Sequence, residues 1–200
     1  MGGGSGLTRP AGVARPEIRI IAGTWRSRRL RFPAVEGLRP TPDRVRETLF
    51  NWLRDAIEGA RCLDLFAGSG ALGFEAASRG AARVVQVDAS ARVCSSLRQH
   101  CARLAADGVQ VVEAQSRQFL LGVAEPFDVV FLDPPFRRGW LAPLCESLER
   151  RGWLAPEALI YLEFERELRL DGLLPPTWSG WRHGTAGEVG YALYQRRPAA

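Results

Sequence analysis

Apolar and polar positions follow a different pattern on the two sides of residue 60. Before it, Ile18 and Ile20 alternate with Arg19, as in a half-exposed strand, and a second short strand is expected after a turn. After it, short apolar runs alternate with segments of helical period. The expected strands are 17–21, 28–32, 62–66, 83–87, 109–112, 127–132, 158–164 and 189–194. Strands and helices in alternation predict an α/β fold with a mostly parallel, doubly wound sheet.

Helical spacing fills the segments between these strands. Thr41 is expected to cap the first helix, with Pro42 at its first position, and apolar residues continue the period to about Ile57. The last strand is expected to close the sheet as part of a C-terminal hairpin, with Trp178 and Trp181 in the preceding loop. The expected helices are 42–57, 71–78, 90–104, 118–121 and 141–150.

Three regions follow from these patterns. Residues 1–16 are rich in Gly, Pro and Arg and are expected to form a disordered basic tail. Residues 17–37 should form a β-hairpin arm that binds RNA, and residues 38–200 the α/β domain. The N-terminus shows no apolar signal segment, and no apolar run reaches membrane-spanning length. We therefore expect a cytoplasmic protein without membrane association.

Charge is unevenly distributed along the chain. Residues 1–46 hold ten arginines against three acids, whereas the remainder holds seventeen arginines against nineteen acids. The excess positive charge is thus N-terminal, which indicates a polyanionic partner. A solvated arm without a partner is the alternative.

Metal chemistry finds little support in the cysteines and histidines. The four cysteines form no Cys-x-x-Cys pair and have no histidine at metal-binding spacing, which predicts reduced thiols and no metal site. His100 and His183 are isolated in the sequence and are expected at the surface.

A glycine-rich loop carries the first chemical motif. Gly68, Gly70 and Gly73 match the Gly-x-Gly-x-x-Gly pattern between an expected strand and helix. Asp88 lies twenty residues after Gly68, at the end of the next strand, where a carboxylate can accept both ribose hydroxyls. The motif predicts an adenosine-containing ligand above the carboxyl ends of the strands.

Asp64, just before the loop, bears on the ligand's identity. An acid there would repel a pyrophosphate, but it would attract the ammonium and sulfonium of S-adenosylmethionine. S-adenosylmethionine is therefore favoured over NAD, and no convincing hydride-transfer site supports an oxidoreductase. A hydrogen-bonded aspartate without a ligand is the alternative.

The second motif is Asp133-Pro134-Pro135-Phe136, after an apolar strand. The two prolines stiffen the backbone and remove two N–H donors, which leaves the Asp133 carboxylate and the Pro134 carbonyl as acceptors. Such acceptors suit an amino group that donates two hydrogen bonds while its lone pair is directed at a methyl donor. Phe136 offers a face for an unstacked base. An ordinary Pro-Pro turn with a core phenylalanine is the alternative.

Together the two motifs resemble those of the amino-group methyltransferases, which have the Rossmann-like class I methyltransferase sheet. Segments 19–30, 38–51, 63–73 with 78–81, and 129–139 further resemble the RsmD family of 16S rRNA guanine-N2 methyltransferases, and the resemblance extends from about residue 17 to Arg196. It implies methyl transfer from S-adenosyl-L-methionine to N2 of one guanine. It also implies 16S rRNA as the partner, in an assembling or assembled small ribosomal subunit, and a monomeric enzyme.

Residue patterns and the resemblance together define three expected sites. The expected catalytic residues are Asp133, Pro134, Pro135 and Phe136. The expected cofactor-binding residues are Asp64, Phe66, Ala67, Gly68, Ser69, Gly70, Asp88, Gln115, Ser116 and Thr41. The expected RNA-binding residues are Arg19, Trp25, Arg26, Arg28, Arg29, Arg31, Arg137 and Arg138, with Phe32 as a further aromatic for stacking.

Other functions remain open at this point. A DNA amino-methyltransferase or a protein-glutamine methyltransferase would use a similar Pro-Pro loop, often with Asn in place of Asp133. A catalytically silent RNA-binding module would retain the basic arm, although Asp88 and Asp133 argue against it.

Overall fold

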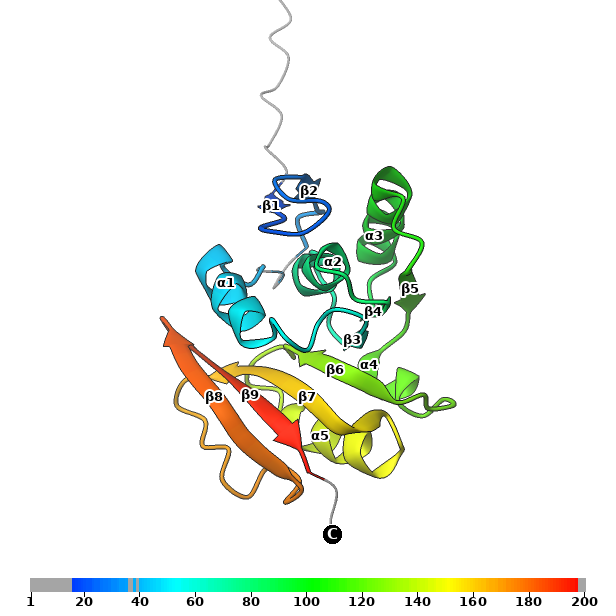
Figure 1. The fold of residues 1–200 in the computed structure, drawn as a ribbon. Helices are drawn as coiled ribbons and strands as arrows, with labels where there is room; N and C mark the ends of the chain where they lie inside the picture. The colour runs from blue at the N-terminus through cyan, green and yellow to red at the C-terminus, as the bar shows by residue number, and fades with distance from the viewer. Residues whose placement is uncertain (1–15, 36–37, 39, 198–200) are drawn as a thin grey trace, which may run out of the picture.

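The computed structural model describes residues 16–35, 38 and 40–197, and the chain forms a small hairpin followed by one large sheet (Figure 1). The hairpin pairs β1 (Glu17–Arg19) with β2 (Arg29–Arg31). The predicted tail 1–16 lies outside the described residues except for Pro16. The large sheet contains β3 (Arg61–Asp64), β4 (Arg83–Asp88), β5 (Val109–Glu113), β6 (Phe127–Leu132), β7 (Leu154–Glu165), β8 (Trp178–Ala186) and β9 (Val189–Arg196).

The strand order is β5-β4-β3-β6-β7-β9-β8. Strands β3 to β7 are parallel, whereas β9 runs antiparallel to both β7 and β8. The chain builds outward from β3 in one direction and then crosses to β6 on its other side. This reversal between β3 and β6 is the point at which open α/β sheets bind ligands, outside the carboxyl ends of their strands. The predicted mostly parallel, doubly wound sheet is confirmed.

Helices cover both faces of the sheet (Figure 1). Side chains of α1 and α2 pack in one apolar cluster, and those of α5 pack in another on the opposite face. No helix in the described part of the chain is long and apolar enough to cross a membrane. The helices are α1 (Asp43–Trp52), α2 (Ala71–Ser78), α3 (Ala91–Leu104), α4 (Ser116–Phe119) and α5 (Leu141–Arg150).

Two predictions about α1 were wrong. The helix ends at Trp52, not near Ile57. The residues that follow form turns, and Leu53 and Ile57 reach the core from these turns, so their apolar spacing does not reflect a helix. The N-cap of α1 is Pro42 and not Thr41. The hydroxyl of Thr41 instead donates a hydrogen bond to Glu163 at 2.9 Å.

The predicted loop before the last strand is a strand. Trp178 and Trp181 both lie in β8, at the edge of the sheet, where Trp178 is buried and Trp181 is exposed. Most of β8 is polar or glycine, so it lacks the alternation that would have predicted a strand.

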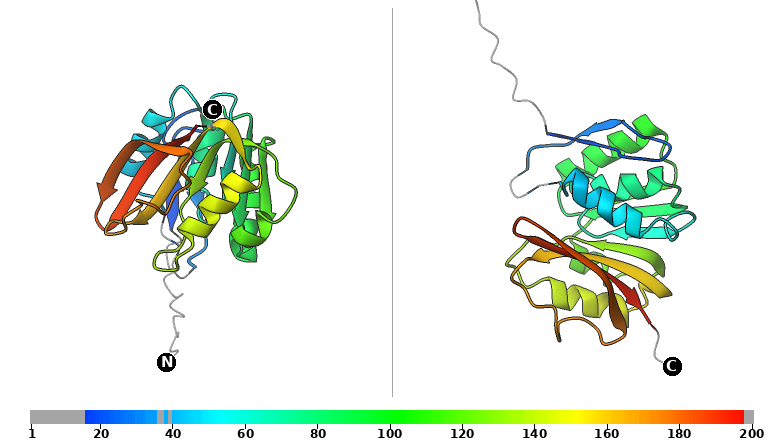
Figure 2. Two further views of the ribbon diagram at one scale, coloured as in Figure 1. Left: turned by 90° about the horizontal axis from the view of Figure 1, so that it is seen from below. Right: turned by 60° about the vertical axis from the view of Figure 1, so that its left-hand side comes forward.

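The N-terminal hairpin has one apolar and one basic face. Ile18 and Leu30 are buried in a cluster with Phe74 of α2 and Leu97 of α3, while the arginines of β1 and β2 face solvent. Phe32 is buried in the same cluster, so the expectation that it stacks on a base was wrong. Figure 2 shows the hairpin at the opposite end of the molecule from β8 and β9.

A buried carboxylate fixes the start of the hairpin turn. Glu75 of α2 is fully buried and accepts the backbone N–H groups of Ile21 at 2.8 Å and Ala22 at 3.0 Å. Its charge is balanced by Arg79, 2.8 Å away, and by the buried guanidinium of Arg46, 3.4 Å away. The hairpin, α1 and α2 thus meet at one ionic group.

Helix α3 holds the second strand of the hairpin. His100 contacts the Arg31 carbonyl through Nε2 at 2.7 Å, and Arg103 donates to the carbonyl of Arg29. His100 is buried, so its predicted surface position was wrong, and burial lowers its pKa. A neutral ring can donate its Nε2 proton to the carbonyl.

We expect Glu75→Ala to lower the free energy of unfolding by about 3–5 kcal/mol, since it leaves the buried Arg46 with the exposed Asp43 as its remaining carboxylate partner and leaves two hairpin N–H groups without an acceptor. Urea denaturation measures this change. Glu47→Ala, at an exposed position of α1, should change it by less than about 0.5 kcal/mol. Equal stability of the two variants would show that the ionic group does not hold the hairpin.

Candidate cofactor and catalytic site

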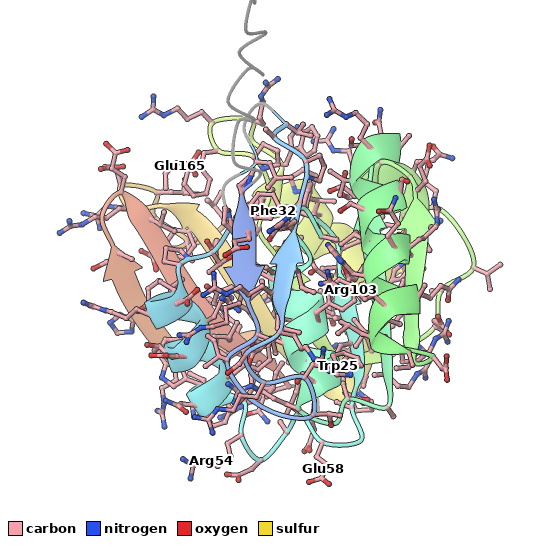
Figure 3. All side chains as sticks on the ribbon, turned by 90° about the horizontal axis from the view of Figure 1, so that it is seen from above. Trp25, Phe32, Arg54, Glu58, Arg103 and Glu165 are labelled. Atoms are coloured by element: carbon pink, nitrogen blue, oxygen red, sulfur yellow. The ribbon has the colours of Figure 1, made fainter. Side chains whose placement is uncertain are left out.

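Two acids meet where β6 and β7 end. Leu132 pairs with Leu162 in the parallel register, which places Asp133 beside Glu163 on the neighbouring strand. Residues two apart on a strand share a face, so both acids lie on the face of the sheet that carries α1. Figure 3 views the molecule from the hairpin side, with Glu165 at the end of β7 toward the top and Glu58, which precedes β3, toward the bottom.

Asp64 is the third acid of this group, on the same face at the end of β3. Only 3% of its surface is exposed, and this burial raises the pKa of its carboxyl to about 7. The charges of Asp88 and Glu163 raise the pKa further, while hydrogen bonds from the backbone N–H groups of Phe66 and Gly73 lower it.

Burial also raises the pKa of Asp133 well above its ordinary value, with further contributions from Glu163 and Asp64. Glu163, whose pKa is likewise raised by burial, accepts hydrogen bonds from the hydroxyls of Thr41 and Tyr161, both at 2.9 Å. Among the described residues, no arginine or histidine pairs with any of these three acids. A cationic ligand would therefore supply the positive charge that these acids lack among the described residues.

The glycine loop forms the wall beside Asp64. Gly68 and Gly70 have φ values of +50° and +79°, which glycine adopts without strain. A Cβ at Gly70 would also lie 2.6 Å from the ring of Phe74. Asp88 accepts the N–H groups of Gly68 at 3.0 Å and Ser90 at 2.8 Å, so it ties the loop to the start of α3.

The other expected cofactor residues line the neighbouring strand ends. Phe66 packs against Trp140, with 5.9 Å between ring centroids, and Ala67 and Ser69 are buried in the loop. Ser116 is also buried and donates to the backbone carbonyl of Leu65 at 2.6 Å. Gln115 precedes α4 and is exposed, with no side-chain hydrogen bond to another described residue.

The Asp-Pro-Pro-Phe loop projects from the end of β6. Pro134 is buried, whereas Pro135 is exposed and Phe136 is 37% exposed, so Phe136 is not a core side chain. The next residue, Arg137, has a φ of +58° and donates its backbone N–H to Glu165 of β7. This contact anchors the loop to the strand that carries Glu163.

A basic surface borders the site. Figure 3 shows Phe32, at one end of the hairpin, on the same side of the molecule as Glu165, while Trp25 in the turn lies toward Glu58. Trp25 is half-buried with its ring edge-on to Phe74. The exposed predicted RNA-binding arginines are Arg19, Arg26, Arg28, Arg29, Arg31, Arg137 and Arg138.

Sequence reasoning missed several contributors to these surfaces. Arg103 of α3 extends the basic face of the hairpin (Figure 3), and Glu163 and Tyr161 complete the acidic group. The apolar run 158–164 contains one acid, Glu163, and this exception was the available signal. No cluster of metal-binding side chains occurs within residues 16–35, 38 and 40–197.

We expect the ligand-free protein to lose stability as pH rises from about 5 to about 8. The folded state holds the Asp64 proton up to about pH 7, whereas the unfolded chain releases it near 3.8, so this contribution to the free energy of unfolding falls over that interval. Urea denaturation at both pH values would measure it. Asp64→Asn should flatten the dependence, and a variant with the wild-type slope would contradict the assignment.

Comparisons with known proteins agree with this geometry. The family model described as Conserved hypothetical protein 95 matches residues 18–195. Ribosomal RNA small subunit methyltransferase D of Escherichia coli K12 is 49% identical over 190 residues, which cover 95% of this chain and 96% of the relative. The solved structure of yhhF from Escherichia coli is 50% identical, with a TM-score of 0.83 and coverage of 91% of this chain and 99% of that chain.

A more distant neighbour bears on the fold alone. An RNA methyltransferase from Salinibacter ruber, solved in complex with S-adenosyl-L-homocysteine, is 16% identical, with a TM-score of 0.63 and coverage of 81% of this chain and 96% of that one. The resemblance to the class I methyltransferase fold, expected from the sequence, is thereby confirmed. The chain belongs to the family described as Conserved hypothetical protein 95, which is the RsmD family.

Proposed function

We propose that this protein transfers a methyl group from S-adenosyl-L-methionine to the exocyclic N2 of a guanine in 16S rRNA of the small ribosomal subunit. The observation that carries the proposal is the acidic group formed by the buried Asp64 and Glu163 and the half-buried Asp133 at the reversal between β3 and β6, beside the Asp-Pro-Pro-Phe loop and the basic hairpin. The names of the relatives support rRNA of the small subunit as the substrate.

The residues present fit S-adenosylmethionine. When bound, this cofactor supplies an electrophilic methyl group on a positively charged sulfur. The acidic group has no cationic partner among the described residues. The sulfonium and the methionine ammonium of the cofactor would both supply one. Gly68 and Gly70 would let the loop backbone approach the methionine part, and Asp88 at the end of β4 would accept the ribose hydroxyls.

The Asp-Pro-Pro-Phe loop would hold the target base. Phe136 offers its exposed ring for stacking, while the Asp133 carboxylate and the Pro134 carbonyl accept the two hydrogens of the amine. This orients the nitrogen lone pair and places negative charge where positive charge develops on nitrogen. Asp133 directly follows the buried strand β6, which would hold its backbone in place before the reaction begins.

The hairpin would hold the RNA that flanks the base. Its arginines face solvent, and Arg103 widens the basic face. Guanidinium groups on a rigid support suit phosphate contacts, and this favours RNA over a protein glutamine as the substrate. We also propose that the protein is a monomer in the cytoplasm and that it acts on an assembling or assembled small ribosomal subunit.

We expect the wild-type protein to transfer radiolabelled methyl groups to small subunits that lack their own modification, with N2-methylguanosine as the product on nucleoside mass analysis. Asp133→Ala should slow this transfer by about a hundredfold or more, since it removes a preorganised charge, but should retain cofactor binding by calorimetry. Methyl label on DNA or glutamine instead of rRNA would refute the proposed substrate. N2-methylguanosine formed by Asp133→Ala at the wild-type rate would refute the proposed role of Asp133.

We further expect replacement of Arg26, Arg28, Arg29 and Arg31 by alanine to weaken RNA binding and spare cofactor binding. Each lost phosphate contact removes roughly 0.7–0.9 units from the slope of log affinity against log salt, so the slope should change by about three units. RNA affinity at several salt concentrations measures this.

A matched control replaces four exposed arginines outside the hairpin, namely Arg54, Arg150, Arg169 and Arg197, and should leave the slope almost unchanged. Identical slopes for both variants would show that the hairpin is not the RNA-binding surface. Deletion of residues 1–32 is unsuitable, because it would remove Ile18, Ile20 and Leu30 from the apolar core.

A further inference from the structure

Glu163 is a buried acid that the sequence motifs did not include, and the proposed function gives it only a shared part in balancing the charge of the cofactor. It lies in β7 with 4% of its surface exposed, and one of its oxygens, Oε1, accepts both the Thr41 and the Tyr161 hydroxyl. These donors come from different parts of the chain, the segment before α1 and the strand itself. The carboxylate is therefore held in one orientation from two sides.

Its neighbour on the next strand is Asp133. The register of β6 and β7 places the two residues side by side on the same face of the sheet, next to the base-binding loop. Two neighbouring carboxyl groups in a site largely shielded from water cannot both ionise without a large cost, so they bind protons as a pair. Burial and mutual repulsion raise the pKa of Asp133, and burial raises that of Glu163.

We propose that Glu163 is a positioning residue that acts through Asp133, so that the two carboxylates together take up the proton released by the target amine. This inference rests on the methyl transfer proposed above. Glu163 itself does not contact the base. The negative charge of Glu163 makes Asp133 a stronger proton acceptor. The hydroxyls of Thr41 and Tyr161 hold the Glu163 carboxylate in a fixed position beside Asp133.

The atoms and charges of this step balance. The amine nitrogen forms a bond to the methyl carbon, the carbon–sulfur bond breaks with its electron pair on sulfur, and one N–H proton passes to an oxygen of Asp133. The pair gains one positive charge as the donor sulfur loses one, so the net charge of the buried site stays constant. After the products leave, the proton passes to water.

Other titratable groups face Glu163 and must be accounted for. Asp64 approaches from β3 and Tyr161 lies on β7, with the Tyr191 ring of β9 centred 6.5 Å from that of Tyr161. Asp64 is the group whose titration could be mistaken for that of the pair, so its resonance must be followed separately.

The decisive variant is Glu163→Gln, which retains an oxygen acceptor for Thr41 and Tyr161 but removes the charge. Carbon-13 titration of the aspartate carboxyl groups, in the protein without cofactor, should show the pKa of Asp133 lowered by about one unit. With cofactor and RNA saturating, kcat should fall about tenfold or more and its acidic limb should move to lower pH. Cofactor affinity, measured by calorimetry near neutral pH, should change less than kcat.

A matched variant, Tyr161→Phe, should act in the opposite direction. It removes one hydrogen bond that lowers the pKa of Glu163 and leaves the charge in place, so the pair should bind its first proton at higher pH. The acidic limb of kcat should then move to higher pH. Two limb shifts of opposite sign are not expected if Glu163 only supports the fold.

The outcomes separate this inference from the proposed function. An unchanged pKa of Asp133 in folded Glu163→Gln, or wild-type kcat and pH profile in a protein that methylates RNA, would overturn the role of Glu163. Wild-type protein without methyl transfer to RNA would instead overturn the proposed function, whatever the carboxyl titration shows.

Discussion

Glu75 is a carboxylate with no access to water, and several parts of the chain depend on its ionic contacts. It accepts two backbone N–H groups of the hairpin, while Arg46 and Arg79 supply the positive charge that makes its burial tolerable. A pair of this kind stabilises little compared with apolar packing, but loss of one partner is costly. It therefore fixes a single arrangement of the hairpin on α2, and with it the position of the basic face.

The sequence predicted elements well where periodicity and burial coincide. The bounds expected for α2, β6 and α5 are those observed, since each element buries one clear apolar face or run. The expected end of α1 was too late because Leu53 and Ile57 keep the helical spacing while the backbone turns. Strand β8 gave no such pattern, because an exposed edge strand buries little beyond Trp178.

The sequence motifs of the site could be predicted, but the side-chain contacts that hold its acidic residues in place could not. Asp64 and Asp133 flank the reversal of the sheet, a relation that follows from strand order and loop chemistry. The contact of Thr41 with Glu163 joins residues 122 positions apart, and tertiary packing brings them together. Tyr161 lies two residues from Glu163 on β7, but its bond to Glu163 depends on both side chains facing the same buried site. Long-range polar contacts leave no local signature in the chain.

The packing of the hairpin has a thermodynamic consequence. Ile18 and Leu30 share one apolar cluster with Ala67 and Ala71, which belong to the glycine loop and the start of α2. Through these contacts, RNA that shifts the hairpin would also alter the packing of the cofactor loop, and a cofactor that shifts the loop would alter the packing of the hairpin. Such coupling would be reciprocal, so RNA and cofactor would each change the affinity for the other by the same factor.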